Sequence, residues 1–590
     1  KEFNRNLSDE NVHILDPFTG TGTFITRLIQ TGLIDKEALP RKYANELHAN
    51  EIVLLAYYIA SINIENAYHD AVGQENGYKP FNGICLTDTF QLGESDSADE
   101  LFSDMLPQNS ERVIEQKKLP VRVIIGNPPY SVGQKSANDN AQNQKYPILD
   151  GRIADTYVKM TNATNKNALY DSYIKAFRWS SDRIDNEHGG IVAFVSNGSW
   201  LDNQGMDGFR KCLEQEFSSI YVFNLRGNCR TSGELRRKEA GNVFGLGSRT
   251  PISITILVKH PNKNPDKKAT IYYNEVADYM TREEKLALVA QYKTITNSKM
   301  PLKALKPNEH NDWLNQRSDL FSSYIPIGDK DDKCIFSIDS IGLTTGRDAW
   351  CCNFSKEVLS KSIRQSIDFY TKQLNEYTEK LSLNKSLTIE EFIDTNPAKI
   401  SWSRGLKNKF KNGSKIQYND DSIVYMSYRA FTKNYVYYDS CLNEYLYKTS
   451  KIFPTRTTSN LVIAVSSAGS NKGLSVLISN NICDAHYNGD THCFPLYYYE
   501  ENKGNIGTLF DQGKENYIRR DGITDFILEQ CRTRYGHKVS KEDIFYYVYG
   551  LLHSKDYREQ FAADLKKMLP RIPLLMFLMI SGRLARQEEN

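Results

Sequence analysis

The chain has 590 residues, 40% of them hydrophobic and 25% charged, so it can bury the cores of two or three domains. Its 74 Lys and Arg nearly balance 72 Asp and Glu, and this total does not identify a nucleic-acid partner. Ten scattered cysteines and no secretory signal exclude a disulfide-rich secreted protein and favour the reducing cytoplasm. The apolar run 574–580 is too short to cross a membrane.

The first motif is a short apolar strand that ends in a glycine turn, Asp16-Pro-Phe-Thr-Gly-Thr-Gly22. A helical stretch follows from Phe24 to Gln30. In such strand–turn–helix units, glycines let the backbone approach a ligand closely. A pair of glycines alone is weak evidence for a cofactor loop.

Two carboxylates strengthen this interpretation. Glu46 lies some twenty positions beyond the glycines, near a second strand, where an acidic residue can bind ribose hydroxyls. Asp88 follows a third strand, Ile84 to Leu86, where it can accept a hydrogen bond from an adenine amino group. Each taken singly is more often a surface carboxylate, but their order along the chain supports a cofactor site. The predicted cofactor-binding residues are Asp16, Pro17, Phe18, Gly20, Gly22, Glu46 and Asp88.

The most informative motif is Asn127-Pro128-Pro129-Tyr130, directly after the apolar strand Val121 to Ile125. An exocyclic amine is a poor nucleophile until acceptors hold its two hydrogens, and the Asn127 side chain and the Pro128 carbonyl can do so. Two prolines stiffen the turn, and Tyr130 can stack on an extruded base. With the glycine turn, the motif predicts an S-adenosylmethionine-dependent amino-methyltransferase in which all four residues are catalytic.

Up to about residue 275, apolar runs of strand length alternate with helical patterns, which predicts a parallel sheet with helices on both faces. The polar stretch 131–151 interrupts this alternation and is either a mobile lid over the target base or only a disordered loop. Beyond residue 276, long helices are mixed with short β-rich segments, including 355–381 and 423–426. Methyl transfer does not need this second half, so we expect it to recognise a target sequence.

Cations in both halves are candidates for DNA contacts. The run 402–411 interleaves cations with aromatic residues, although a solvated charged loop would have the same composition. Spacing alone does not assign bases to side chains. The predicted DNA-binding residues are Arg226, Arg230, Arg236, Arg237, Arg347, Arg404, Lys407, Arg429 and Lys433.

Cys483, His486, His492 and Cys493 lie close together, but zinc ligands usually come in two separated pairs. The adjacent His492 and Cys493 are awkward ligands, so we expect packed or exposed side chains and no metal.

The order of these motifs along the chain resembles that of the gamma class of adenine-N6 DNA methyltransferases. The cofactor turn comes first, Asn-Pro-Pro-Tyr comes second, and a large further region comes last. Longer stretches resemble the methyltransferase and target-recognition part of single-polypeptide Type I (Type ISP) restriction–modification enzymes. These stretches are Asn224–Glu234, Gly241–Ile252, Thr345–Trp350, Tyr428–Lys433, Asp543–Tyr549 and Leu569–Pro573. The resemblance implies a Rossmann-like class I methyltransferase domain, a mixed α+β recognition domain, S-adenosylmethionine as cofactor and double-stranded DNA as partner.

Such enzymes carry nuclease and helicase-like domains ahead of the methyltransferase. No Gly-x4-Gly-Lys-Ser/Thr loop occurs here, so we expect this chain to be the C-terminal part of a longer polypeptide. The expected domains are a catalytic domain (1–275), a connecting segment (276–330), a recognition domain (331–535) and a C-terminal helical segment (536–590). Two alternatives remain open: a recognition module with little methylation of its own, and a methyltransferase acting on protein glutamine or RNA guanine.

Overall fold

The computed structural model describes residues 2–73, 77–94, 107–130, 145–163, 165–245, 248–261, 263–264, 266–329, 333–468, 470, 473–502 and 517–574. The chain forms two compact units, Lys1–Gln316 and Arg317–Asn590. No helix within these ranges is both long enough and apolar enough to span a membrane.

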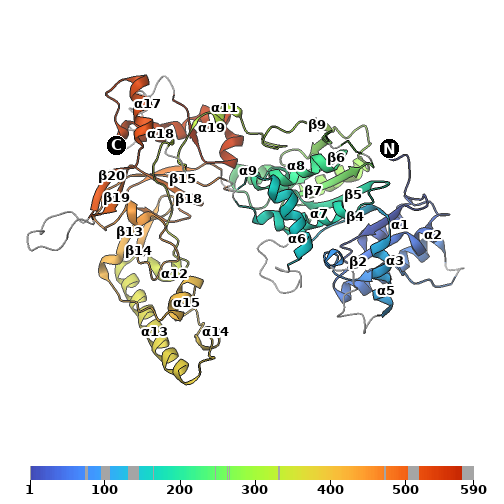
Figure 1. Ribbon diagram of the computed structural model, residues 1–590, viewed down its shortest axis with the longest axis horizontal. Helices are drawn as coiled ribbons and strands as arrows, with labels where there is room; N and C mark the ends of the chain where they lie inside the picture. The colour runs from blue at the N-terminus through green and yellow to red at the C-terminus, as the bar shows by residue number, and fades with distance from the viewer. Residues whose placement is uncertain are drawn as a thin grey trace, which may run out of the picture. The chain divides into compact units, whose positions relative to one another are not determined.

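A nine-stranded sheet forms the centre of the first unit (Figure 1). Its strand order is β3-β2-β1-β4-β5-β7-β6-β8-β9, and β1 to β5 run parallel to one another. The strands are β1 (His13–Asp16), β2 (Leu47–Glu51), β3 (Ile84–Leu86), β4 (Val121–Gly126), β5 (Gly190–Asn197), β6 (Ser219–Arg226), β7 (Ile252–Lys259), β8 (Thr270–Glu275) and β9 (Lys303–Leu305).

Helices cover both faces of this sheet, as the alternation of patterns predicts. Successive residues of a strand point to opposite faces, and in β1 Ile14 joins one apolar cluster while Leu15 joins another. The helices are α1 (Thr23–Gln30), α2 (Leu39–Asn45), α3 (Leu54–Val72), α5 (Pro107–Lys118), α6 (Pro147–Ile153), α7 (Ser172–Arg183), α8 (Asp207–Glu216), α9 (Gly233–Glu239) and α10 (Arg282–Tyr292).

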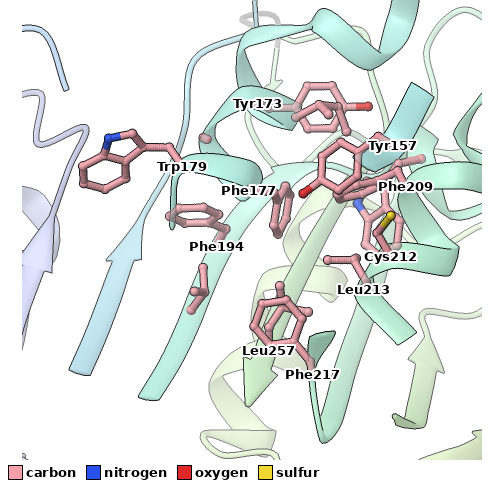
Figure 2. Close-up of a cluster of buried hydrophobic side chains, with 14 of the residues drawn as sticks. Tyr157, Tyr173, Phe177, Trp179, Phe194, Phe209, Cys212, Leu213, Phe217 and Leu257 are labelled. Atoms are coloured by element: carbon pink, nitrogen blue, oxygen red, sulfur yellow. The ribbon is translucent and has the colours of Figure 1, made fainter. Parts of the chain in front are cut away.

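Aromatic side chains dominate the apolar cluster that contains Leu15 (Figure 2). The ring centroid of Phe177 on α7 lies 5.2 Å from that of Phe194 on β5 and 5.4 Å from that of Phe209 on α8. This packing fixes α7, which also carries the fully buried Tyr173.

The structure corrects the expectation of a wholly parallel sheet. β7 pairs antiparallel with both β5 and β6. Arg226 at the end of β6 is in register with Ile252 at the start of β7, so the chain turns back at the same edge without the crossover that a parallel strand requires.

The first unit also extends beyond the expected boundary at residue 275. β9 pairs with β8, and the Lys285 side chain of α10 is fully buried, where its ammonium donates to the carbonyls of Glu239 and Gly241. The boundary therefore falls between Gln316 and Arg317, because most of the expected connecting segment packs into the first unit.

The second unit is built from small sheets and helices. Two four-stranded sheets have the orders β11-β18-β15-β16 and β12-β14-β13-β17, and two further pairs are β10-β21 and β19-β20. The strands are β10 (Ile325–Pro326), β11 (Ser340–Ile341), β12 (Cys352–Asn353), β13 (Ile423–Arg429), β14 (Thr432–Tyr437), β15 (Val462–Ser466), β16 (Val476–Ser479), β17 (Ile482–Cys483), β18 (Thr491–Pro495), β19 (Tyr497–Glu501), β20 (Tyr517–Asp521) and β21 (Arg571–Ile572).

The longest described helix of this unit is α13, close to the range expected at 355–381. Its apolar side packs into a cluster that also includes buried residues of α14, α15, β13 and β14. Of the expected C-terminal segment, 536–574 is described and largely helical, whereas 575–590 lies outside the described residues. The helices are α11 (Asp319–Ser322), α12 (Asp348–Cys351), α13 (Lys356–Leu383), α14 (Ile389–Phe392), α15 (Arg404–Lys411), α16 (Thr449–Ile452), α17 (Asp525–Tyr535), α18 (Lys541–His553), α19 (Lys555–Gln560) and α20 (Ala562–Lys567).

Candidate active site

The strand order reverses its direction between β1 and β4. From β1 the chain proceeds to β2 and β3 on one side, whereas β4 proceeds to β5 on the other. In open parallel sheets, ligands bind where this direction reverses, outside the carboxyl ends of the strands. Asp16 ends β1 and Gly126 ends β4, so the glycine turn and the Asn127-Pro-Pro-Tyr130 motif leave the sheet at this point.

The glycine turn needs glycine for two reasons. Gly20 and Gly22 have φ values of +57° and +86°, in the left-handed region that favours glycine. A Cβ on Gly22 would also lie 3.2 Å from the Cα and the carbonyl oxygen of Ala60 on α3. The turn is held at its middle, because the amide of Thr19 donates to the carbonyl of Asn50 at 3.0 Å.

Asp16 is a fully buried carboxylate at the carboxyl end of β1. Its Oδ1 accepts from the amide of Phe18 at 3.1 Å, whereas Oδ2 has no partner within the described part of the chain. Burial raises its pKa to about 7. A Cβ on Gly126 would approach Oδ1 to 2.9 Å, so glycine is required where the two strands leave the sheet. A donor or cation from a ligand would satisfy the unpaired oxygen.

The acidic residue at the carboxyl end of β2 is Glu51, not Glu46. Glu51 accepts from the amide of Gly20 through Oε2 at 2.8 Å and from the amide of Val53 through Oε1 at 2.7 Å. Glu46 precedes β2, and in a parallel sheet this places it at the opposite edge from the glycine turn. The prediction that Glu46 contacts the ribose is therefore wrong, because Glu46 lies at the opposite edge of the sheet from the glycine turn.

Glu46 instead has a structural role at the amino edge of the sheet. Its carboxylate pairs with the buried Lys42 at 2.7 Å and with Arg41 at 2.5 Å, and it accepts from the amide of Asn11 at 2.6 Å. These partners lower its pKa against the opposing effect of burial.

Asp88 lies at the carboxyl end of β3, at the expected edge. Its Oδ1 accepts from the amide of Phe90 at 3.0 Å, and its Oδ2 accepts from the hydroxyl of the buried Tyr146 at 2.8 Å. Next to it, the Thr89 hydroxyl donates to the Pro17 carbonyl at 2.6 Å. The glycine turn and the end of β3 are thus tied together.

Several residues of this edge carry no signal in the sequence analysis. Asn50 is fully buried, and its Nδ2 donates to Thr89 at 3.3 Å. Glu51 could be found from the sequence only if the end of β2 were placed correctly. Tyr146 could be found only if it were known to be the partner of Asp88. Phe18 was predicted, and its ring lies 5.4 Å from that of Phe90.

The Asn127-Pro-Pro-Tyr130 turn presents Asn127 to solvent and buries Pro128. The Tyr130 hydroxyl donates to Asn127 Oδ1 at 3.2 Å, and its ring meets that of Tyr173 edge-on at 6.1 Å. Burial raises the pKa of Tyr130, so its hydroxyl stays protonated as a donor. The expected lid at 131–151 falls mostly on residues 131–144, outside the described residues.

Cations of the first unit divide into paired and exposed groups. Arg226 pairs with Asp278 at 2.5 Å and with Glu239 at 3.3 Å, so it braces its own loop. Arg236 donates to the carbonyl of Ala240. Arg230 and Arg237 are exposed, and Arg237 pairs with Glu234 at 3.2 Å.

The second unit corrects two more of these candidates. Arg347 is only 6% exposed and donates to the Ser403 hydroxyl, so it does not reach the surface as a phosphate contact would require. Arg429 pairs with Asp484 at 2.6 Å and with Asp348 at 3.5 Å. Arg429 is half-buried, as is Lys407, whereas Arg404 and Lys433 are exposed.

The two Cys residues between 483 and 493 are buried, and the two His residues each lie beside a carboxylate. Cys483 and Cys493 are buried. His486 pairs with Asp490 and His492 pairs with Asp339, each at 3.3 Å.

Comparison with known proteins gives consistent matches. Residues 334–576 match the family model of the Type ISP C-terminal specificity domain. The chain is similar over 99% of its length to a nuclease-deletion mutant of the Type ISP restriction–modification enzyme LlaGI in complex with a DNA substrate mimic, with 40% identity, a TM-score of 0.84 and 45% of that chain covered. No curated protein matches.

Two further structures are similar to this degree. The ATP-dependent Type ISP enzyme LlaBIII bound to DNA gives 37% identity and a TM-score of 0.86, with 100% of this chain and 37% of that chain covered. The DrdV–DNA complex gives 34% identity and a TM-score of 0.84, with 99% and 55% covered. The chain thus spans between 37% and 55% of the length of these relatives.

Proposed function

Because the chain belongs to the Type ISP restriction–modification enzymes and carries their C-terminal specificity domain, we propose that it is the modification and specificity part of such an enzyme. In this role it transfers the methyl group of S-adenosylmethionine to adenine N6 in duplex DNA. The observation that carries the proposal is the position of Asn127-Pro-Pro-Tyr130 beside the glycine turn, at the carboxyl ends of β1 and β4.

The edge of the sheet fits the cofactor in several respects. Gly20 and Gly22 let the backbone approach it, and the unpaired Oδ2 of Asp16 can receive its ammonium group. Each Glu51 oxygen accepts one backbone amide and retains a lone pair for a ribose hydroxyl. Asp88 lies at the end of the next strand, as an adenine amino contact requires. The cofactor supplies an electrophilic methyl group on a sulfonium.

The chain's own residues prepare the amine. Asn127 Oδ1 and the Pro128 carbonyl accept its two hydrogens and draw the nitrogen lone pair out of the ring. The lone pair held in this way would be directed at the methyl carbon that the bound cofactor would supply, and the cofactor's sulfur would keep the electrons of the carbon–sulfur bond. The methylated nitrogen releases its extra proton to solvent, so no residue with a tuned pKa is needed. Tyr130 stacks on the base after it has left the helix.

Recognition belongs to the second unit in this proposal. Residues 334–576 match the specificity domain, and the similar Type ISP structures hold DNA or a DNA mimic. The exposed Arg404 and Lys433 are its candidates for phosphate contacts. The exposed Arg230 and Arg237 are candidates for the same role in the first unit.

Mass spectrometry of nucleosides from plasmid DNA tests the proposal. The DNA is incubated with the chain and S-adenosylmethionine, with Asn127→Ala as control. N6-methyladenine that depends on Asn127 is the expected result, and sequencing the modified sites gives the recognition sequence. Site-specific DNA binding without methylation would instead support a recognition module that needs further domains for activity.

A further inference from the structure

Phe431 in the second unit is an aromatic residue that is almost fully exposed. β13 and β14 form a hairpin in which Arg429 pairs with Thr432, so Ala430 and Phe431 alone make the turn. Phe431 is 95% exposed and has a φ of +60°. At the third position of such a turn a positive φ is normally supplied by Gly or Asn. A bulky residue there costs conformational energy, and its exposure means that core packing does not compensate.

The base of this hairpin is fixed by several contacts. The register shifts between Ser427 and Arg429, which leaves Tyr428 as a bulged residue. The Tyr428 hydroxyl donates to Asp348 at 3.0 Å, and the Arg429 guanidinium lies 3.8 Å from the centre of its ring. Arg429 also pairs with Asp484 at 2.6 Å. The hairpin therefore presents Phe431 from an anchored support.

The surroundings of Phe431 match the chemistry of DNA. Lys433, two residues away on β14, is exposed and can contact a phosphate. A single protruding ring is too small to form a protein interface, which needs an apolar patch of several hundred Å². A ring of this size does match the gap between two neighbouring base pairs, where proteins insert Phe as an apolar wedge.

We propose that Phe431 is such a wedge, which enters between neighbouring base pairs of duplex DNA while Lys433 holds the adjacent backbone. The inference rests on the proposed DNA recognition by the second unit. The inference adds Phe431 as a residue that unstacks bases, whereas the Arg and Lys candidates contact phosphates through their charge. It also gives a reason for a strained Phe where Asn or Gly would be more stable.

The test uses the full chain and plasmid DNA carrying the sites mapped by methylation. Phe431→Asn removes the ring and suits the positive φ. Loss of one stacking contact corresponds to roughly 5- to 150-fold weaker specific binding, with an unchanged dependence on salt. Permanganate oxidises unstacked thymines, and the thymine opposite the flipped adenine serves as the internal reference because base flipping alone exposes it. A wedge would make a further thymine reactive, and Phe431→Asn should abolish the reactivity of that further thymine only. The matched control is Leu383→Ala, which truncates a side chain that is 84% exposed at the end of α13.

Thermal stability separates a wedge from a structural residue. Phe431→Asn should melt at the same temperature or about 2–4 °C higher, because Asn adopts the positive φ at lower cost. Phe431→Trp should keep DNA binding and permanganate reactivity. Unchanged binding and reactivity in Phe431→Asn would overturn the proposal, as would a lower melting temperature that accounts for the loss. If the unaltered chain bound no DNA, the proposed function itself would fail.

Discussion

Glu51 and Glu46 lie at opposite ends of β2, and this pair tests where the cofactor binds. In Glu51→Gln the amide nitrogen replaces one acceptor oxygen. Either the Gly20 or the Val53 amide then loses its partner, and one lone pair for a ribose hydroxyl is lost. A hydrogen bond to a charged group contributes about 1.5–3 kcal/mol, so we expect S-adenosylmethionine to bind roughly 10- to 150-fold more weakly.

Glu46→Gln is the matched control. It weakens the partner of Lys42, whose side chain is fully buried, although Lys42 still donates to the carbonyls of Asp9 and Val12. We expect about 1–3 kcal/mol of lost stability and an unchanged cofactor affinity. Isothermal titration calorimetry with S-adenosylmethionine measures affinity, and thermal melting measures stability. Normal affinity in Glu51→Gln together with weak binding in Glu46→Gln would refute the assignment of the cofactor edge.

Five further substitutions, at Asn127, Gly126, Asp16 and Tyr130, test the proposed site at the carboxyl ends of β1 and β4. Asn127→Ala should lower the single-turnover methylation rate by roughly 100- to 1000-fold and leave cofactor affinity unchanged, because it removes an acceptor used in the transition state. Gly126→Ala places a Cβ 2.9 Å from Asp16 Oδ1 and should destabilise the fold by about 1–3 kcal/mol in thermal melts while weakening cofactor binding in calorimetry. Burial raises the pKa of Asp16 to about 7, so the folded chain retains a proton that the unfolded chain releases. The free protein should therefore lose stability as pH rises from about 4 to about 7. The affinity for the cofactor should rise up to about tenfold per pH unit over the same range and level off above pH 7. A calorimetric pH series in which the affinity of Asp16→Asn changes with the same slope would contradict this. Tyr130→Phe should nearly retain the KM for DNA and Tyr130→Ala should raise it, since the ring face matters more than the hydroxyl; equal effects in steady-state kinetics would argue against stacking.

Sequence reasoning located β1, β3 and β4 because each is an apolar run that stops at Gly, Pro or a carboxylate. It misplaced the acidic residue of β2 because that strand, Leu47-His-Ala-Asn-Glu51, contains three polar residues, all buried. Their burial depends on partners from other elements, such as His13, whose Nδ1 lies 3.0 Å from His48 Nε2. Spacing from the glycines alone could not reveal this.

The DNA candidates show a second limit. Arg347 and Arg404 look equivalent in the sequence, yet the first is buried and the second is exposed. Whether a cation is free for a phosphate depends on carboxylates that are distant in sequence, as with Arg429 and Asp484. The exposed Phe431 also went unnoticed, because only the hairpin register reveals its φ and its isolation.

The boundary between Gln316 and Arg317 has an evolutionary consequence. Among the described residues, the three apolar clusters of the second unit contain none from before Arg317, and those of the first unit contain none from after Gln316. Genetic exchange at this point therefore leaves every one of these cores whole. Under the proposed function, recombination at this point would give a lineage a new target sequence in one step and leave the methyl-transfer site unchanged.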